Sequence, residues 1–238
     1  MSTGAAKAQK VVSHEEWLAA RREFLRKEKE FTRLRDELSQ QRRELPWEKV
    51  EKQYVFEGPQ GKQALAELFD GKNQLVIYHF MFAPEWEAGC PSCSFWADNF
   101  NPNVVHLKHR DITMIAVSRA PYAKLVAYQK RMSWNFKWVS SYGTDFNFDY
   151  HVSFTPEEVA RKQAEYNYAT QRVGGLELPG TSVFCKDESG NVFHTYSTYG
   201  RGLDLQNATY NYIDLTPKGR DENGRGQFWV RRRDEYTD

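Results

Sequence analysis

The sequence has few cysteines, almost no net charge and no long apolar run, and each shortage excludes a class of protein. Three cysteines among 238 residues are an odd number, which argues against a secreted disulfide framework. With 33 Lys and Arg against 32 Asp and Glu, the chain offers no reason to expect a nucleic-acid or anionic-membrane partner. No run approaches the ~18 apolar residues of a membrane-spanning helix, and residues 1–20 lack the apolar stretch of a signal peptide. We therefore expect a soluble protein of the reducing cytoplasm.

Aromatic residues, by contrast, are abundant. The chain contains 15 Phe, 13 Tyr and 7 Trp, which together make up 15% of its residues. A chain of this length buries on the order of 70% of its unfolded surface, so it needs no disulfide scaffold to fold. Its length fits one large domain or two small ones.

The N-terminal part predicts a long helix. Residues 1–12 are small or polar and predict a disordered lead-in, whereas residues 13–46 form a charged helical pattern that Ser13 and Glu16 can open as a capping box. Two interpretations stay open, because the helix could pack on its own domain or form a swapped or dimer-forming arm. Apolar residues recur in it every seven positions: Trp17, Phe24, Phe31 and Leu38.

Residues 47–215 alternate between strands and helices. The unbroken apolar run 75–82 is typical of a central strand that is covered on both faces. Its alternation with later helical patterns predicts βαβ units and an α/β fold, with an aromatic-rich insertion at about 142–178 and a polar tail over 216–238. In the tail, acidic residues balance the run of three arginines, so we expect it to be solvated. The expected elements after the central strand are a helix over 91–107, a strand over 111–118, a helix over 121–132, a strand over 136–141, a hairpin over 181–199 and a helix over 203–212.

The segment around Cys90 and Cys93 carries the clearest chemistry. Two cysteines separated by two residues, between a buried strand and a helix, form a Cys-x-x-Cys redox signature. Cys90 would cap the helix and Pro91 would take its first position, where proline is tolerated. Free backbone N–H groups and the helix dipole favour a thiolate there, and Cys93 lies one turn later, within reach of a mixed disulfide.

Two other interpretations of the cysteines stay open. A zinc site could add His106 and His109 to the pair, although a second Cys-x-x-Cys is missing. The two thiols could also be inert and buried, as we expect for Cys185 in its strand. We expect no bound metal and no cofactor.

The order of elements resembles that of thioredoxins. In thioredoxins a cis-proline precedes the last hairpin and lies beside the catalytic sulfurs, and here Pro179 has a similar spacing, with an ordinary loop proline as the alternative. A buried Asp of thioredoxins, which helps to accept the proton of the second Cys, is matched by His79. An imidazole could act as the base, or His79 could be a satisfied core histidine. Trp86 stands three residues further from the first Cys than its thioredoxin counterpart, so the active loop is longer.

That longer loop also resembles the one in peroxiredoxins, where a Thr-x-x-Cys opens a helix. Here Glu87 occupies the position of the threonine, and a negative charge there opposes a Cys90 thiolate. Among other polar residues, Arg119 ends a buried strand, where α/β sheets bind ligands, and it either holds an anionic substrate group or lies on the surface.

Over roughly residues 12–235 the chain resembles one bacterial and fungal family, the thioredoxin-like domain-of-unknown-function family eight-nine-nine, described as predicted dithiol-disulfide oxidoreductases. The resemblance implies a thioredoxin-like fold, a central mixed sheet flanked by helices, and Cys90 and Cys93 as the redox pair. The strings that carry it are YHFMF (78–82), GCPSCSFWAD (89–98), VSRAP (117–121), WVSSYGTDFNFD (138–149), VFHTYSTYGRGLD (192–204) and YNYIDLTPKGRDE (210–222).

The sequence therefore predicts a thiol–disulfide oxidoreductase. Its expected substrate is a disulfide-containing or oxidised small molecule or protein, and its long helix suggests a homodimer. The alternatives are a non-redox protein that binds a small ligand in its aromatic insertion, and a thiol peroxidase. The candidate catalytic residues are Cys90, Cys93 and His79, and the candidate substrate-binding residues are Pro179, Trp86 and Arg119.

Overall fold

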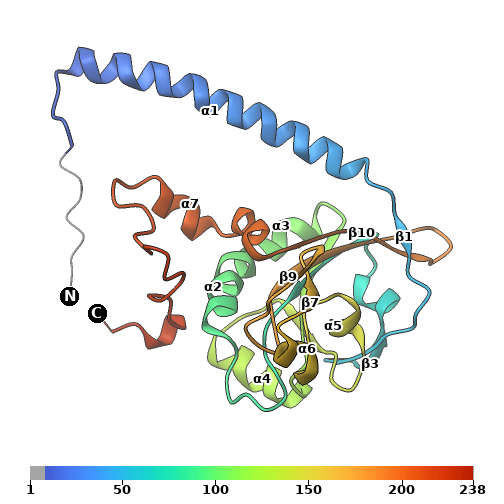
Figure 1. Ribbon diagram of the computed structural model, residues 1–238. Helices are drawn as coiled ribbons and strands as arrows, with labels where there is room; N and C mark the ends of the chain where they lie inside the picture. The colour runs from blue at the N-terminus through green and yellow to red at the C-terminus, as the bar shows by residue number, and fades with distance from the viewer. Residues whose placement is uncertain (1–8, 238) are drawn as a thin grey trace.

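The computed structural model describes residues 9–237, and within them an eight-stranded mixed sheet forms the centre of the molecule (Figure 1). The strands lie in the order β1-β10-β9-β4-β5-β6-β2-β3. Their bounds are β1 Glu48–Lys49, β2 Val55–Gly58, β3 Gly61–Ala64, β4 Gln74–His79, β5 Ile112–Ser118, β6 Lys137–Ser140, β9 Gly180–Lys186 and β10 Val192–Tyr199. A separate small hairpin joins β7 Ala164–Tyr166 to β8 Ala169–Gln171.

The helices lie between these strands and at the two ends of the chain. The α-helices are α1 His14–Arg43, α2 Pro91–Phe100, α3 Val104–Lys108, α4 Tyr122–Arg131, α5 Phe146–Asp149, α6 Pro156–Arg161 and α7 Ala208–Asp214. Short 3₁₀ helices are η1 Leu65–Phe69, η2 Asn101–Asn103, η3 Gly200–Gln206 and η4 Arg233–Glu235. None of the helices within the described range is long and apolar enough to cross a membrane.

The topology confirms the predicted thioredoxin-like α/β fold. Strands β4, β5 and β6 run parallel, whereas β9 is antiparallel to β4 and β10 is antiparallel to β9. Helix α2 follows β4, helix α4 follows β5, and helix α7 follows the β9–β10 hairpin. Before β4, residues 61–64 complete the β2–β3 hairpin, and Leu65–Phe69 form a 3₁₀ helix.

The sheet separates two apolar clusters, which account for much of the aromatic content. Helices α2, α4 and α7 cover one face, where Phe80 packs on Trp138 with ring centroids 4.6 Å apart. Segments η1 and α5 cover the other face, where Phe56 packs on Phe146 at 4.8 Å. Because side chains of a strand alternate, β4 contributes to both clusters.

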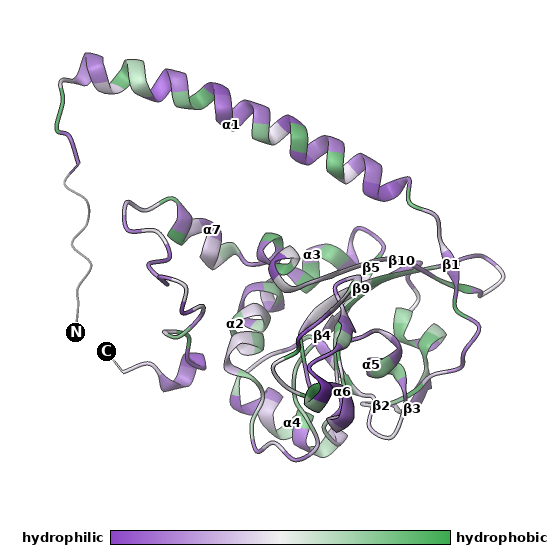
Figure 2. Cartoon of the chain, in the orientation of Figure 1, coloured by the Kyte–Doolittle hydropathy of each residue, from purple (hydrophilic) through white to green (hydrophobic). Residues whose placement is uncertain are grey.

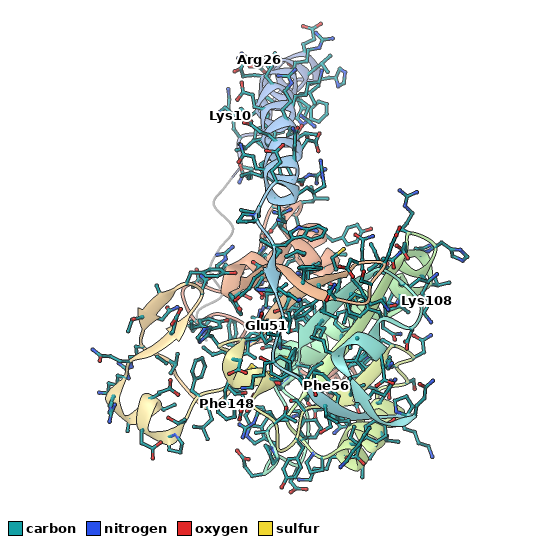
Figure 3. The ribbon with its side chains drawn as sticks, turned by 90° about the vertical axis from the view of Figure 1, so that its right-hand side faces the viewer. Lys10, Arg26, Glu51, Phe56, Lys108 and Phe148 are labelled. Carbon is teal, nitrogen blue, oxygen red and sulfur yellow. The ribbon has the colours of Figure 1, made fainter. Side chains whose placement is uncertain are left out.

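Helix α1 stands apart from the sheet instead of packing on it (Figures 1 and 3). The capping box of Ser13 and Glu16 is present, as predicted, yet none of the helix's side chains is buried. Phe31 is 62% exposed, and hydrophobic bands recur along the helix (Figure 2). The structure thus contradicts packing on its own domain. The expected lead-in falls largely on residues 1–8, outside the described range.

The C-terminal segment packs on the domain, which corrects the expectation of a solvated tail. Val230 is buried, and the Trp229 ring packs against Phe95 of α2 and Tyr210 of α7. The segment therefore returns to α2, at whose start Cys90 lies.

Candidate functional site

Cys90 caps the N-terminus of α2, as the sequence predicted. Pro91 takes the first helical position. The Cys90 backbone N–H donates to the Met81 carbonyl at 3.1 Å, which ties the residue to the segment that leaves β4. The cap places the Cys90 side chain where backbone N–H groups of the first turn lack helical partners.

Cys93 lies one turn further along α2 and is buried, with 1% of its surface exposed. Its sulfur accepts a hydrogen bond from the Met81 N–H at 3.4 Å. Both residues are free thiols in the structure. Met81 therefore contacts both cysteines, through its carbonyl and its amide.

The pKa values of the two thiols are shifted in opposite directions. A hydrogen bond from Cys93, aided by N–H groups of Cys93 and Ser92, lowers the pKa of Cys90 to about 7 against the opposing effect of burial. Burial and the neighbouring Cys90 sulfur raise the pKa of Cys93 well above its ordinary value. Near neutral pH, Cys90 is therefore the more acidic thiol of the pair, and Cys93 keeps its proton.

Tyr78 lies beside the cysteines, although the sequence analysis did not select it. Both residues line the same cavity, and the Tyr78 phenol lowers the pKa of the Cys93 thiol, which offsets part of the burial effect. Burial raises the pKa of Tyr78 itself well above its usual value. The phenol therefore keeps its proton over the whole physiological range. Period-two alternation in YHFMF was the signal that could have identified it.

The structure does not bring His79 to the cysteines. It is the next residue on β4, so its ring lies on the opposite face of the sheet, where it stacks on Tyr150 with centroids 5.9 Å apart. Its Nε2 lies 2.8 Å from the Ser182 hydroxyl. Burial, with a smaller effect of His194, lowers the pKa of His79 to about 3. The ring stays neutral and is held as a core histidine.

A cavity of about 230 Å³ opens beside Cys93. Pro179 lies in its wall, so the structure places the proline beside the buried sulfur. Within residues 9–237 every peptide bond is trans, and Pro179 is thus an ordinary trans proline. The lining residues are Tyr78, Ser92, Cys93, Trp96, Pro179, Gly200, Arg201, Leu203, Asp204 and Gln227.

Trp86 and Arg119 do not line this cavity. Trp86 packs half-buried against the cluster that contains Cys93, and its carbonyl accepts from the Lys124 ammonium at 3.0 Å. Arg119 donates to the side chain of buried Glu177 at 2.9 Å, so an internal partner already holds its guanidinium. Burial raises the pKa of Glu177 to about 7.

The Glu87 side chain is 95% exposed and lies 3.8 Å from the Lys124 ammonium, so its charge is solvated and has a cationic neighbour. The described residues contain no group of three or more His, Cys, Asp and Glu side chains that could hold a metal ion. His106 and His109 therefore do not complete a zinc site with the pair. Cys185 is half-buried on β9, and burial raises its pKa.

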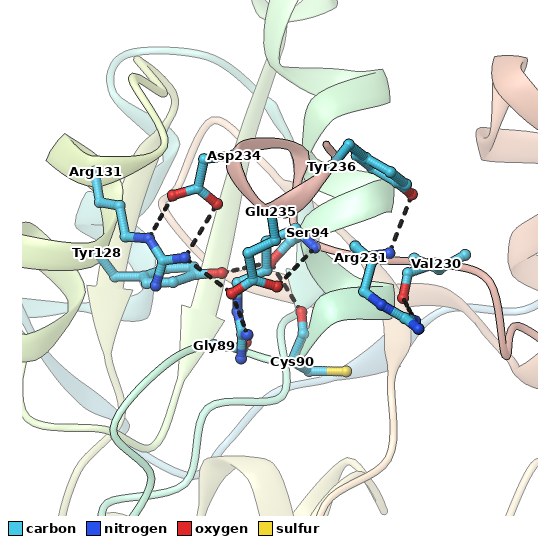
Figure 4. A network of polar contacts seen from close by, with 11 residues as sticks. Gly89, Cys90, Ser94, Tyr128, Arg131, Val230, Arg231, Asp234, Glu235 and Tyr236 are labelled. Carbon is cyan, nitrogen blue, oxygen red and sulfur yellow. Dashed lines mark hydrogen bonds and ion pairs between the residues drawn. The ribbon is translucent and has the colours of Figure 1, made fainter. Parts of the chain in front are cut away.

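A polar network joins the C-terminal segment to the residues around Cys90 (Figure 4). The Arg232 guanidinium donates to the Gly89 carbonyl from Nε at 3.0 Å and from Nη2 at 2.8 Å. Next to it, the Ser94 hydroxyl donates to the Cys90 carbonyl at 2.8 Å. Sequence reasoning missed Arg232, since a contact across 143 residues leaves no local pattern.

The chain matches the sequence model of a family described as "Bacterial protein of unknown function (DUF899)" over residues 6–236. No curated protein matches it in sequence.

Several solved structures are similar to the chain at low identity. Peroxidoxin BcpB from Mycobacterium tuberculosis is 13% identical, with a TM-score of 0.45, over 71% of this chain and 97% of that one. A PrxQ mutant from Xylella fastidiosa is 10% identical, with a TM-score of 0.44, over 70% and 95%. Peroxiredoxin Q from Xanthomonas campestris is 12% identical, with a TM-score of 0.43, over 73% and 99%. The activities in these names are those of the neighbours.

Proposed function

The chain belongs to the family of bacterial proteins of unknown function DUF899. We propose that it is a thiol–disulfide oxidoreductase. The observation that carries the proposal is the pairing of two free thiols of opposite acidity. Cys90, at the start of α2, has a pKa lowered to about 7, and Cys93, one turn later, stays protonated. A nucleophile and a resolving thiol require this difference.

The reaction proceeds in two exchanges. The Cys90 thiolate attacks one sulfur of a substrate disulfide, a new sulfur–sulfur bond forms, and the other substrate sulfur leaves as a thiolate that takes a proton from solvent. Cys93 then loses its proton and attacks the Cys90 sulfur, which releases the second substrate thiolate. The substrate gains two electrons and the protein retains a Cys90–Cys93 disulfide. An external dithiol reductant returns the pair to its starting state, so we place the protein in the reducing cytoplasm.

Tyr78 takes the place that the sequence analysis gave to His79. Its hydroxyl lies beside Cys93, and in this proposal it donates to the thiolate that must form in the second exchange. His79 faces the other apolar cluster and takes no part in proton transfer in this scheme. Pro179 contributes to the wall against which a substrate would lie beside Cys93.

Variants of the three cysteines test the proposal. With dithiothreitol as reductant, Cys90→Ser should abolish reduction of insulin or of a small aromatic disulfide. Cys93→Ser should accumulate a covalent Cys90–substrate adduct that mass spectrometry detects. Cys185→Ser is the matched control and should retain wild-type turnover. Unchanged turnover in both Cys90→Ser and Cys93→Ser would exclude the mechanism.

The cavity beside Cys93 favours a second candidate, a protein that binds a small apolar ligand without redox exchange. Alkylation with iodoacetamide across pH separates the two. If the pH midpoint of Cys90 alkylation lies at ~8.5 or above and no reversible Cys90–Cys93 disulfide forms, the ligand-binding function is favoured. A thiol peroxidase is the other alternative, and consumption of hydrogen peroxide that depends on Cys90, with no reduction of disulfides, would identify it.

We also propose that α1 pairs with α1 of a second copy of the chain. The helix has acidic residues in its first turn, Glu15 and Glu16, and basic residues in its last, Arg42 and Arg43, so antiparallel pairing joins opposite charges. Nine Lys or Arg against seven Asp or Glu over His14–Arg43 give little attraction to an anionic membrane. Pairing would cover the exposed column of Trp17, Phe24, Phe31 and Leu38, which no side chain of the domain buries.

A further inference from the structure

The C-terminal segment 228–237 reaches the residue that precedes the nucleophile. Its Arg232 donates twice to the Gly89 carbonyl, and the next residue, Cys90, begins α2. The two donors lie 3.0 and 2.8 Å from the same oxygen, within the ordinary range for charge-assisted hydrogen bonds. The guanidinium is 19% exposed, so solvent only partly competes for it.

A second layer of charged contacts holds Arg232 in place. The Glu235 carboxylate accepts from Arg232 Nη1 at 2.9 Å and from Arg131 of α4 at 3.0 Å. Arg131 also donates to both oxygens of Asp234, at 2.6 and 3.0 Å (Figure 4). Arg232 therefore connects the loop before Cys90 to α4 through fixed partners and does not act as a loose surface charge.

Gly89 is a point where the backbone has little freedom. A Cβ atom there would lie 2.7 Å from the Phe80 ring and 2.8 Å from the Tyr128 ring, so the loop is pressed against the core. The residue is buried, and its carbonyl would lose both guanidinium donors if Arg232 were removed. Leaving a buried carbonyl without donors costs about 1–3 kcal/mol, which is enough to shift a short loop.

We propose that Arg232 is a positioning residue for the thiol chemistry of Cys90. By holding the Gly89 carbonyl, it fixes the turn that sets Cys90 at the N-terminus of α2. This inference rests on the proposed function for its role in turnover. The placement of Cys90, however, is measured independently of any substrate.

The groups around the Cys90 sulfur come from two elements. On α2, Cys93 and the N–H groups of Ser92 and Cys93 lower the pKa of Cys90, and on β4 Tyr78 lies in the same cavity wall as Cys93. Arg232 and Glu235 lie behind it, next to Gly89. The donors from α2 reach the sulfur only while Cys90 keeps its cap position. A freed Gly89 carbonyl weakens those bonds, and the acidity of Cys90 falls.

The test is the pH profile of Cys90 alkylation by iodoacetamide in a Cys185→Ser background, followed by peptide mass spectrometry. Arg232→Ala should raise the midpoint from about 7 toward ~8.5 and slow alkylation at pH 7 roughly tenfold. The high-pH plateau should stay the same. Arg232→Lys keeps the charge but not the paired donors, so it should give an intermediate midpoint. Arg231→Ala is the matched control, because Arg231 donates only to carbonyls of its own segment, Phe228 and Val230, and should not shift the midpoint.

An unchanged midpoint in Arg232→Ala would overturn the inference. A faster alkylation rate at high pH with an unchanged midpoint would also overturn it, because that result indicates only that the thiol has become more exposed. If Arg232→Ala does not fold, Glu235→Gln loosens the same guanidinium and should raise the midpoint by a smaller amount. If the wild-type midpoint is low, the Arg232 variants shift it and disulfide reduction is nevertheless absent, the proposed function fails while the positioning role stands.

Discussion

Tyr78 and His79 are neighbours on β4, and their side chains point to opposite faces of the sheet. Tyr78 lies with Cys93 in the wall of one cavity, whereas the His79 imidazole lies 2.8 Å from the Ser182 hydroxyl in the other cluster. A one-residue difference in the strand thus decides which side chain can take part in thiol chemistry.

Tyr78→Phe should slow the second exchange. It removes only the hydroxyl, and a hydrogen bond to a charged sulfur contributes about 1.5–3 kcal/mol, so resolution by Cys93 at pH 7 should fall at least tenfold. Single-turnover release of the second thiol from an aromatic disulfide measures this rate. His79→Asn is the neighbouring control and should leave resolution unchanged. Slower resolution in His79→Asn alone would reverse the two roles.

Glu177→Gln should change how stability depends on pH. Burial raises the Glu177 pKa to about 7, above its ordinary value of 4.5, so the folded state binds a proton that the unfolded state has released. Its contribution is complete below pH 4.5 and is lost as pH rises through 7, by an amount on the order of 3 kcal/mol. Urea unfolding at pH 4.5 and 8 should show a smaller loss in Glu177→Gln than in the wild type. An equal loss in both proteins would contradict the shift.

Gly89→Ala should destabilise the fold and the Cys90 site together. Its Cβ would overlap the Phe80 and Tyr128 rings, and overpacking of this kind costs about 1–3 kcal/mol in the free energy of unfolding. Chemical denaturation measures the loss, and iodoacetamide titration should show a raised Cys90 midpoint. Gly174→Ala, where a Cβ meets nothing within 4 Å, is the control and should change neither quantity. If Gly89→Ala is as stable as the wild type, the loop around residue 89 can move away from the Phe80 and Tyr128 rings without cost, which would contradict the prediction.

Substitutions on α1 should change the oligomeric state. The double variant Phe24→Gln with Phe31→Gln removes two rings from the exposed column and should convert a dimer to a monomer in sedimentation equilibrium. Arg22→Gln with Lys29→Gln has the same spacing on the opposite side of the helix and should remain dimeric. A wild-type chain that is monomeric at tens of micromolar would contradict pairing through α1.

Local patterns in the sequence were enough for the central elements and for the position of the cysteine pair. Ser13 and Glu16 form the expected capping box, and Cys90 caps α2 with Pro91 behind it. The run 75–82 predicted the central strand, and β4 covers its first part. These features depend on neighbours within a few residues, which is the range over which propensity, capping and helix geometry act.

Contacts between distant segments decided the rest. Arg119 is held by Glu177 across 58 residues, and Gly89 is held by Arg232 across 143. The sequence marked Arg119 as a candidate substrate-binding residue at a strand end, and Arg232 only as part of a balanced tail. A side chain's partner is set by which surfaces the fold brings together, and that depends on packing of the whole chain. The sequence by itself therefore determined that a thiol pair opens a helix, while the tertiary structure decided which residues hold and tune that pair.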